Sequence, residues 1–244
     1  MIGLYNTIIY HPILNLLVFL YNLIPGHDIG IVIIVITILI RLLLAPLMNR
    51  SLKGQQAMNA IQPKLNELRE KHKGDQQGQA AAMMALYKEH NISPFASCLP
   101  LLVQLPILIA LYQVFRKALS GNLAGLYSFV HNPGAIDPHL FGVLNLAAPS
   151  IVLAILSGLA QFWQSRLMLS KTKSTDPTQR MMTYQTMYVL PIISIAVAWR
   201  LPAGLPLYWL VSTLFSVAQQ YYIIKKHPVS PAIIEVKPNN NQSK

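Results

Sequence analysis

The sequence has few of the residues on which catalytic and metal-binding chemistry depends. Among its 244 residues there are one cysteine, Cys98, and only eight acidic residues. A lone cysteine excludes an internal disulfide and a multi-cysteine metal site, and we expect Cys98 to be a small buried side chain. The chain has neither the G-x-x-x-x-G-K-[ST] nucleotide motif nor the H-E-x-x-H zinc motif. We therefore predict no cofactor, and an enzyme is the least favoured class of function.

Charged residues are scarce, and long apolar runs take their place. Charged residues make up 11% of the chain and hydrophobic residues 53%, with a mean hydropathy of +0.43. This composition is typical of an integral membrane protein. The apolar runs have about the 20 residues that a helix needs to cross a bilayer, whereas barrel strands alternate over about 10. The sequence therefore predicts one all-α membrane domain.

Five apolar segments are predicted to span the membrane. They are 29–48, 94–116, 144–165, 181–199 and 205–224. Most of the basic residues lie on one side of these spans, in the loops 49–93 and 166–180 and in the tail 225–244; those on the other side are Arg116, Lys117 and Arg200. Because cytoplasmic loops retain Lys and Arg, we predict an N-terminus outside and a C-terminus in the cytoplasm. This distribution also accounts for the net charge of +11 without sequence-specific nucleic-acid binding.

Residues 1–28 are apolar but differ from the five spans. At helical spacing, their polar side chains form one narrow stripe, which consists of Thr7, His11, Asn15 and Asn22. Such a stripe is typical of an amphipathic helix that lies in the plane of the membrane interface. Pro12 would also kink a spanning helix. We predict an extracytoplasmic in-plane helix here, with a sixth span as the alternative.

The regions between and after the spans differ in pattern. Apolar residues recur at helical spacing on both sides of the turn-rich KHKGDQQG, so the loop 49–93 is predicted to be a cytoplasmic helical hairpin. Its two apolar faces either pack on each other or form a contact surface for a partner. Residues 117–143 form an extracytoplasmic loop, and the tail 225–244 has the composition of a disordered segment.

Arg41 lies inside the first predicted span, in the run ITILIRLLLAPL. A charge at the centre of a bilayer costs at least ~2.5 kcal/mol on insertion scales, so its side chain must face water or polar groups. All eight acidic residues lie outside the spans or at their edges, and none supplies a counter-ion within the membrane. Polar side chains at helical spacing are the alternative partners: Thr37, Gln104, Ser157, Gln161, Gln164, Ser165, Tyr208, Ser212, Ser216, Gln219 and Gln220.

Each polar stripe taken alone is better explained by hydrogen bonds that join helix to helix. Three stripes together with an unpaired arginine favour a hydrophilic cavity that is open to the cytoplasm and closed toward the outside. A cation without a catalytic group beside it predicts a binding site for a polar or anionic ligand. A small transporter or channel with an anion site at Arg41, or a structural subunit that binds finished helices, are the competing hypotheses.

Several stretches resemble the YidC family of membrane protein insertases, the bacterial relatives of the mitochondrial and chloroplast insertases. They are TILIRLLLAPL, MNAIQPKLNELREKH, MMALYKEHNISPFASCLPLLVQLPILIALY, the TDP at 175–177 and LPAGLPLYWLVSTLFSVAQQ. The resemblance covers about residues 5–226. It implies five spans around a hydrophilic groove, a cytoplasmic hairpin and an in-plane helix, in a bacterial plasma membrane.

The resemblance also implies a function. In the family a groove arginine, matched here by Arg41, attracts polar or acidic segments of newly made membrane proteins, which then enter the bilayer without nucleotide hydrolysis. Thr37 matches a groove-lining threonine. Tyr208 and Trp209 align with two aromatic residues that contact the substrate, although a Tyr is expected in place of Trp209. The implied partners are nascent membrane proteins and lipid, with the Sec translocon and the ribosome as further candidates.

Overall fold

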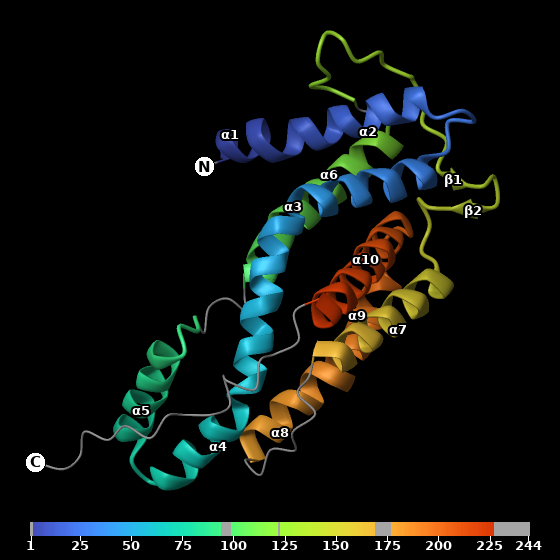
Figure 1. Ribbon diagram of the computed structural model, residues 1–244. Helices are drawn as coiled ribbons and strands as arrows, with labels where there is room; N and C mark the ends of the chain where they lie inside the picture. Colours follow the sequence, from blue (N-terminus) through green and yellow to red (C-terminus); the bar gives the residue numbers. More distant parts are fainter. Residues whose placement is uncertain (1, 94–98, 122, 169–176, 227–244) are drawn as a thin grey trace, which may run out of the picture.

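The computed structural model describes residues 2–93, 99–121, 123–168 and 177–226. Figure 1 shows an elongated bundle of α3, α6, α7, α9 and α10, with α1 and α2 lying across one end and α4 and α5 at the other. We call these the α2 end and the hairpin end. Cys98, the start of the predicted span 94–116, most of the loop 166–180 and all but the first residues of the tail 225–244 lie outside the described residues.

The described part of the chain is mostly helical. Its helices are α1 (Ile2–Tyr5), the π-helix η1 (Asn6–Tyr10), α2 (His11–Leu23), α3 (Ile29–Ala60), α4 (Gln62–Lys71), α5 (Gln76–Glu89), α6 (Leu99–Leu119), α7 (Ile151–Met168), α8 (Pro177–Tyr184), the π-helix η3 (Gln185–Val189), α9 (Leu190–Ala198) and α10 (Gly204–Lys226). The two strands, β1 (His139–Leu140) and β2 (Leu144–Asn145), form an antiparallel pair. This architecture agrees with the predicted all-α membrane class.

Within the described residues, four helical stretches are long and apolar enough to cross a membrane. They are Gly3–Leu23, Ile29–Ala60, Ile151–Met168 and Arg180–Ala198. The last three overlap predicted spans, whereas the first is the segment predicted to lie in the interface. The helices α6 and α10 are not among the four, and the polar stripe of α10 lowers the mean hydropathy of that helix. The number of five spans therefore stays a prediction.

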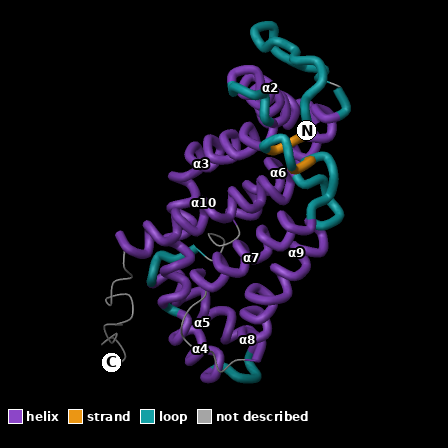
Figure 2. The backbone as a smooth tube through the Cα atoms, turned by 90° about the vertical axis from the view of Figure 1, so that its right-hand side faces the viewer, coloured by secondary structure: helices purple, strands orange, loops and turns teal. Residues whose placement is uncertain are grey.

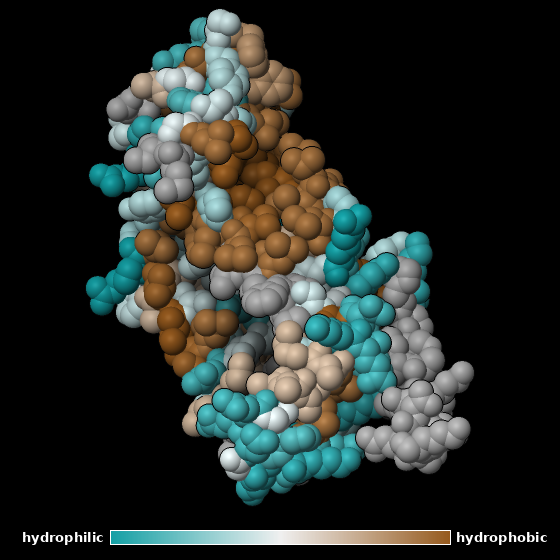
Figure 3. Space-filling model, turned by 90° about the vertical axis from the view of Figure 1, so that its left-hand side faces the viewer, coloured by the Kyte–Doolittle hydropathy of each residue, from teal (hydrophilic) through white to brown (hydrophobic). Residues whose placement is uncertain are grey.

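The helix α10 lies at the centre of the bundle. It packs against α7 on one side and α3 on the other, and α7 packs in turn against α9 (Figures 1 and 2). A Cβ atom on Gly158 would lie 2.3 Å from Cγ1 of Ile195, so α7 and α9 meet more closely than any larger residue would allow. Figure 3 shows a broad hydrophobic surface over the bundle and hydrophilic side chains gathered at the hairpin end. This distribution is the one that a bilayer around the bundle requires.

The polar stripe of the N-terminal helix binds a loop of the protein. The Asn15 side chain is buried, donates to the Gly125 carbonyl at 3.2 Å and accepts from the Tyr127 N–H at 2.7 Å. Asn22 donates to the His131 carbonyl at 2.7 Å. Apolar side chains remain exposed elsewhere on this helix, namely Leu4, Ile8, Phe19 and Leu23. The stripe is thus partly explained by loop packing, and the in-plane position of the helix stays a prediction.

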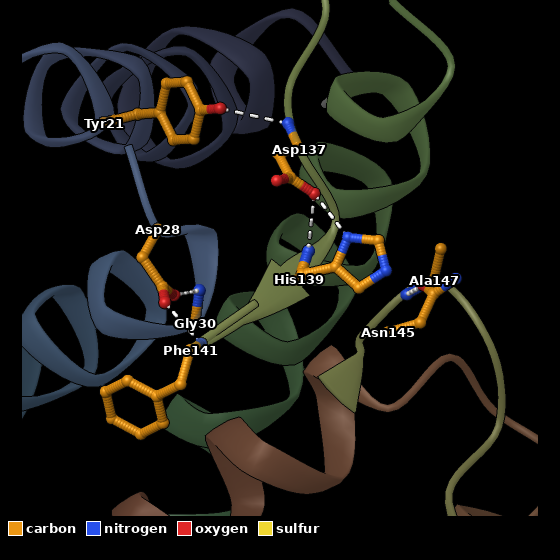
Figure 4. Close-up of polar contacts among 8 residues, drawn as sticks. All are labelled: Tyr21, Asp28, Gly30, Asp137, His139, Phe141, Asn145 and Ala147. Atoms are coloured by element: carbon orange, nitrogen blue, oxygen red, sulfur yellow. Dashed lines mark hydrogen bonds and ion pairs between the residues drawn. The ribbon is translucent and has the colours of Figure 1, made fainter. Parts of the chain in front are cut away.

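Asp28 fixes the start of α3. One of its carboxylate oxygens accepts hydrogen bonds from the N–H groups of Gly30 at 2.8 Å and Ile31 at 3.1 Å, as an N-cap does. The other accepts from the Phe141 N–H in the turn between β1 and β2, at 2.5 Å (Figure 4). A Cβ atom on Gly30 would lie 2.3 Å from Cδ1 of Leu140, so the turn packs directly on the helix. The helix that carries Arg41 is therefore held at its first turn.

At the hairpin end, α3 continues well beyond the predicted span 29–48. Its 32 residues have a length of about 48 Å, more than the ~30 Å of a hydrocarbon core. The helix bends along its length (Figure 1), and Pro46 inside it removes one helical hydrogen bond. The faces of α4 and α5 pack on each other through Leu65 and Leu86, both buried in one apolar cluster. The structure therefore supports the first of the two alternatives for the hairpin, in which its apolar faces pack on each other.

Candidate functional site

Arg41 is the thirteenth of the 32 residues of α3 and is held by two other helices. Its Nε–H donates to the Ser212 hydroxyl of α10 at 2.7 Å, and its Nη2–H donates to Oε1 of Gln104 on α6 at 3.2 Å. The Gln104 amide in turn donates to the Tyr208 hydroxyl. In the described part of the chain, no carboxylate forms an ion pair with Arg41. Its charge is therefore positioned by neutral groups and is not neutralised.

A cavity of about 390 Å³ opens beside Arg41 between α3, α6, α7, α9 and α10. Most of the residues that the sequence predicts for the site line this cavity: Arg41, Gln104, Ser157, Gln161, Gln164, Trp209, Ser216 and Gln219. They come from four helices that are distant in sequence. The geometry thus brings the polar stripes of α7 and α10 together around the arginine, while their role in binding a substrate stays a prediction.

Three predicted site residues do not line the cavity. Thr37 is fully buried, and its hydroxyl donates to the Ile33 carbonyl of its own helix at 2.6 Å. Tyr208 and Ser212 are also buried, but they bind Gln104 and Arg41, which do line the cavity. Tyr208 and Ser212 therefore help to hold Gln104 and Arg41 in place, whereas Thr37 has no hydrogen bond to a cavity residue.

Some of the lining side chains form hydrogen bonds within the protein, and others remain free to bind a ligand. The hydroxyls of Ser157 and Ser216 donate to carbonyls of their own helices, at 2.8 and 3.0 Å. Gln219 donates to Oδ1 of Asn49 at 2.7 Å and so joins α10 to α3. The amides of Gln161 and Gln164 form no hydrogen bond to any described residue. These two amides and the arginine are among the groups that remain to bind water or a ligand.

Three other polar residues line the cavity and were not among the predicted site residues: Gln55, Ser194 and Thr213. Gln55 follows Arg41 by 14 residues, a spacing that returns to the same helix face, so the signal was present. The predicted span ends at residue 48 and so excludes Gln55, whereas α3 continues to Ala60. Ser194 stands alone among apolar neighbours in α9, and no periodic pattern marks it.

The cavity is closed on one side of Arg41. Toward the α2 end, Ile33 and Ile36 of α3, Leu111 of α6 and Leu205 of α10 are almost fully buried in one apolar core. Toward the hairpin end, the lining continues through polar groups of α3, α7 and α10. The site is therefore a one-sided polar recess in an apolar bundle, with a cation at its closed end.

The polar groups at the cavity are not of the kinds that usually bind metal ions. The described residues contain no group of three or more His, Cys, Asp or Glu side chains that could hold a metal ion. The groups present at the cavity are a guanidinium, amides, hydroxyls and an indole. Such groups bind polar and anionic ligands through hydrogen bonds and charge.

Comparison with known proteins places these features in a family. The chain matches the family described as 60Kd inner membrane protein over residues 19–230. It is 39% identical to a membrane protein insertase YidC of Fusobacterium nucleatum, over 89% of this chain and 98% of the relative. It is 35% identical to the membrane protein insertase MisCA of Bacillus subtilis, over 92% of this chain and 82% of the relative.

Other relatives are longer. A membrane protein insertase YidC of Endomicrobium trichonymphae is 35% identical over 88% of this chain, and there the chain spans only 39% of the relative's length. The matched region includes Arg41 and all the cavity residues described above. The resemblance found in the sequence is thereby confirmed: YidC and MisCA membrane protein insertases are relatives of this chain, and the chain belongs to the 60Kd inner membrane protein family.

Proposed function

We propose that this protein inserts newly made membrane proteins into the plasma membrane of a bacterium and assists their folding. The names of its relatives support insertase activity. The observation that carries the groove mechanism is the un-neutralised charge of Arg41 in a polar recess among apolar helices. Such a charge attracts the acidic or polar segment of a client protein.

The physical task of the groove is to reduce desolvation. A short hydrophilic segment that enters hydrocarbon loses its hydrogen bonds to water, which costs several kcal/mol for each unpaired polar group. Within the recess, the free amides of Gln161 and Gln164 and the guanidinium of Arg41 replace part of that hydration. The segment then crosses only the apolar layer beyond Arg41, while its apolar helix moves into lipid. No step requires nucleotide hydrolysis.

The closed side of the recess favours this mechanism over a channel. A transporter or channel needs a polar path through the bundle, whereas the residues beyond Arg41 are apolar and buried. In this mechanism a client enters from the hairpin end and then leaves into lipid.

The distribution of basic residues supports the orientation of the bundle. We place the N-terminus, α2 and the loop 117–143 outside and the hairpin and C-terminus in the cytoplasm. In this orientation the recess opens to the cytoplasm, where nascent chains arrive. The apolar faces of the hairpin pack on each other, so we propose that its outer surface recruits clients. The Sec translocon and the ribosome are further proposed partners on the cytoplasmic side.

The proposal is tested with the purified protein in liposomes. A single-span client with a short acidic N-terminal tail is added without ribosomes, and protection of the tail from protease is measured beside a client with a neutral tail. We expect Arg41→Ala to reduce protection of the acidic tail about tenfold, the equivalent of one charge-assisted hydrogen bond, and to affect the neutral tail less. Arg50→Ala is the matched control, because Arg50 is an exposed arginine on the same helix that does not line the cavity.

Two results would contradict the proposal. Equal loss for both tails in Arg41→Ala would refute charge pairing with the client. If wild type protected neither tail better than empty liposomes, the insertase function itself would be refuted.

A further inference from the structure

A second cavity lies at the α2 end of the bundle, away from the Arg41 recess. Its volume is about 340 Å³. One wall is the last part of α6 and the other is the segment that leads into α10; the lining includes Tyr112, Phe115, Arg116, Ser120, Pro202 and Leu205. Tyr112, Phe115 and Arg116 lie on α6 at helical spacing and so share one face of the helix, and Ser120 directly follows the last residue of α6.

The wall opposite α6 is fixed by backbone hydrogen bonds. The Ala203 N–H donates to the Ala148 carbonyl at 3.0 Å, and the Gly204 N–H donates to the Leu146 carbonyl at 3.1 Å. The side chains of Phe115 and Leu205 at the base of the cavity are only 3% and 2% exposed. The cavity therefore has a firm apolar base and does not depend on loop closure.

Arg116 gives this cavity a positive charge. Its side chain is exposed and has no ion pair or hydrogen bond to any described residue, whereas the ammonium of the adjacent Lys117 lies 4.8 Å from the centroid of the Tyr10 ring. None of the described residues that line the cavity carries a carboxylate. A guanidinium with free donors beside an apolar base suits a ligand that has an anionic head and an apolar body.

The position of Arg116 along α6 decides the type of ligand. Arg116 follows Gln104, the partner of Arg41, by 12 residues, which corresponds to about 18 Å along the helix axis. Half of a hydrocarbon core measures about 15 Å. If Arg41 lies near the middle of the membrane, Arg116 therefore lies at the level of the lipid phosphates.

We propose that this cavity binds the headgroup of an anionic phospholipid of the outer leaflet, with the phosphate at Arg116 and the upper acyl chain against Phe115 and Leu205. The inference rests on the proposed orientation of the bundle and not on its insertion activity. The same two helices carry Gln104 and Ser212, the partners of Arg41. A lipid bound here clamps the outer ends of α6 and α10, and so supports the positions of those partners.

The test uses the purified full chain in neutral detergent micelles, titrated with short-chain phosphatidylglycerol or phosphatidylcholine, with the bound lipid counted by native mass spectrometry. We expect phosphatidylglycerol to bind more tightly than phosphatidylcholine, and Arg116→Gln to weaken phosphatidylglycerol binding about tenfold. Arg200→Gln is the matched control, because Arg200 is an exposed arginine of the same side that does not line the cavity. Ala147→Trp fills the cavity, which Ala147 also lines, and should weaken binding with Arg116 intact.

Three results would overturn the proposal. The first is equal affinity of the wild type for the two lipids. The second is an equal loss of phosphatidylglycerol affinity in Arg116→Gln and Arg200→Gln. The third is displacement of phosphatidylglycerol by inorganic phosphate at equal concentration, which would make the site one for free anions. The liposome insertion assay separates this proposal from the proposed function. Wild-type insertion together with any of these three results overturns the lipid site alone, whereas lipid binding as expected without insertion overturns only the function.

Discussion

The replacement Asp28→Ala tests how firmly the first turn of α3 is held. Asp28 accepts hydrogen bonds from Gly30 and Ile31 of that turn and from the Phe141 N–H in the β1–β2 turn (Figure 4). Alanine removes the N-cap, the negative charge at the positive end of the helix, and the bond to the neighbouring turn. We expect a less stable protein in which the start of α3 opens more often.

The magnitude follows from these three contributions. Replacing an N-cap Asp by Ala costs about 1 kcal/mol. Losing a negative charge at a helix N-terminus costs a further ~0.3–1 kcal/mol. The bond to Phe141 is partly replaced by water, because that residue is exposed, and adds about 0.5 kcal/mol. The expected loss in the free energy of unfolding is therefore about 2 kcal/mol. For Asp28→Asn, which keeps a capping oxygen but not the charge, it should be about half as large.

The assay is reversible unfolding in mixed micelles, together with hydrogen exchange of the first turn of α3. Asp137→Ala is the matched control, since Asp137 is an exposed carboxylate shortly before β1 whose side-chain bonds go to a residue two positions away. If Asp28→Ala unfolds at the same denaturant concentration as wild type, or if its loss is no larger than that of Asp137→Ala, the assigned role of Asp28 is wrong. Insertion by Asp28→Ala should fall only modestly, because Ser212 and Gln104 still hold Arg41.

Three further predictions concern packing, the cavity and pH. Gly158→Ala should destabilise the bundle by about 1–3 kcal/mol, because the added Cβ overlaps a side chain of α9. Gly3 has open space around it, so Gly3→Ala should not destabilise the protein. Equal unfolding midpoints of the two variants would contradict this prediction. Ser212→Ala removes the partner of the Arg41 Nε and should reduce protection of an acidic client tail about fivefold, for a bond worth about 1 kcal/mol, and unchanged protection would refute it. Two hydrogen bonds from His139 hold the pKa of Asp137 below its ordinary value; the bond from the His139 side chain has the larger effect and the bond from its backbone N–H the smaller. A carboxyl group whose pKa is lower in the folded state than in the unfolded state stabilises the fold above the unfolded-state pKa, and this stabilisation is lost as the pH falls through the folded-state pKa. Exchange protection of the β1–β2 turn should therefore be constant above about pH 4 and decrease below it. Equal protection at about pH 3 and pH 6 would contradict this.

Local patterns in the sequence predicted much of the candidate site. The depth of Arg41 in an apolar run and the lack of an intramembrane carboxylate follow from order and composition alone. The stripes of α7 and α10 also followed, because helical spacing determines which residues of a helix share a face. Thr37 shares a face with Arg41 in the same way, yet the cavity does not include it, since neighbouring helices cover that part of α3.

What the sequence by itself determined is the membrane class, the helical periods, the position of the buried charge and the family. Only the tertiary structure decided which groups meet: Arg41 with Ser212 and Gln104, the Asn15 side chain with the loop at Gly125, and the walls of the two cavities. The physical reason is that periodicity defines the faces of one helix but not its rotation or depth relative to its neighbours. Those are set by close packing of side chains from distant parts of the chain.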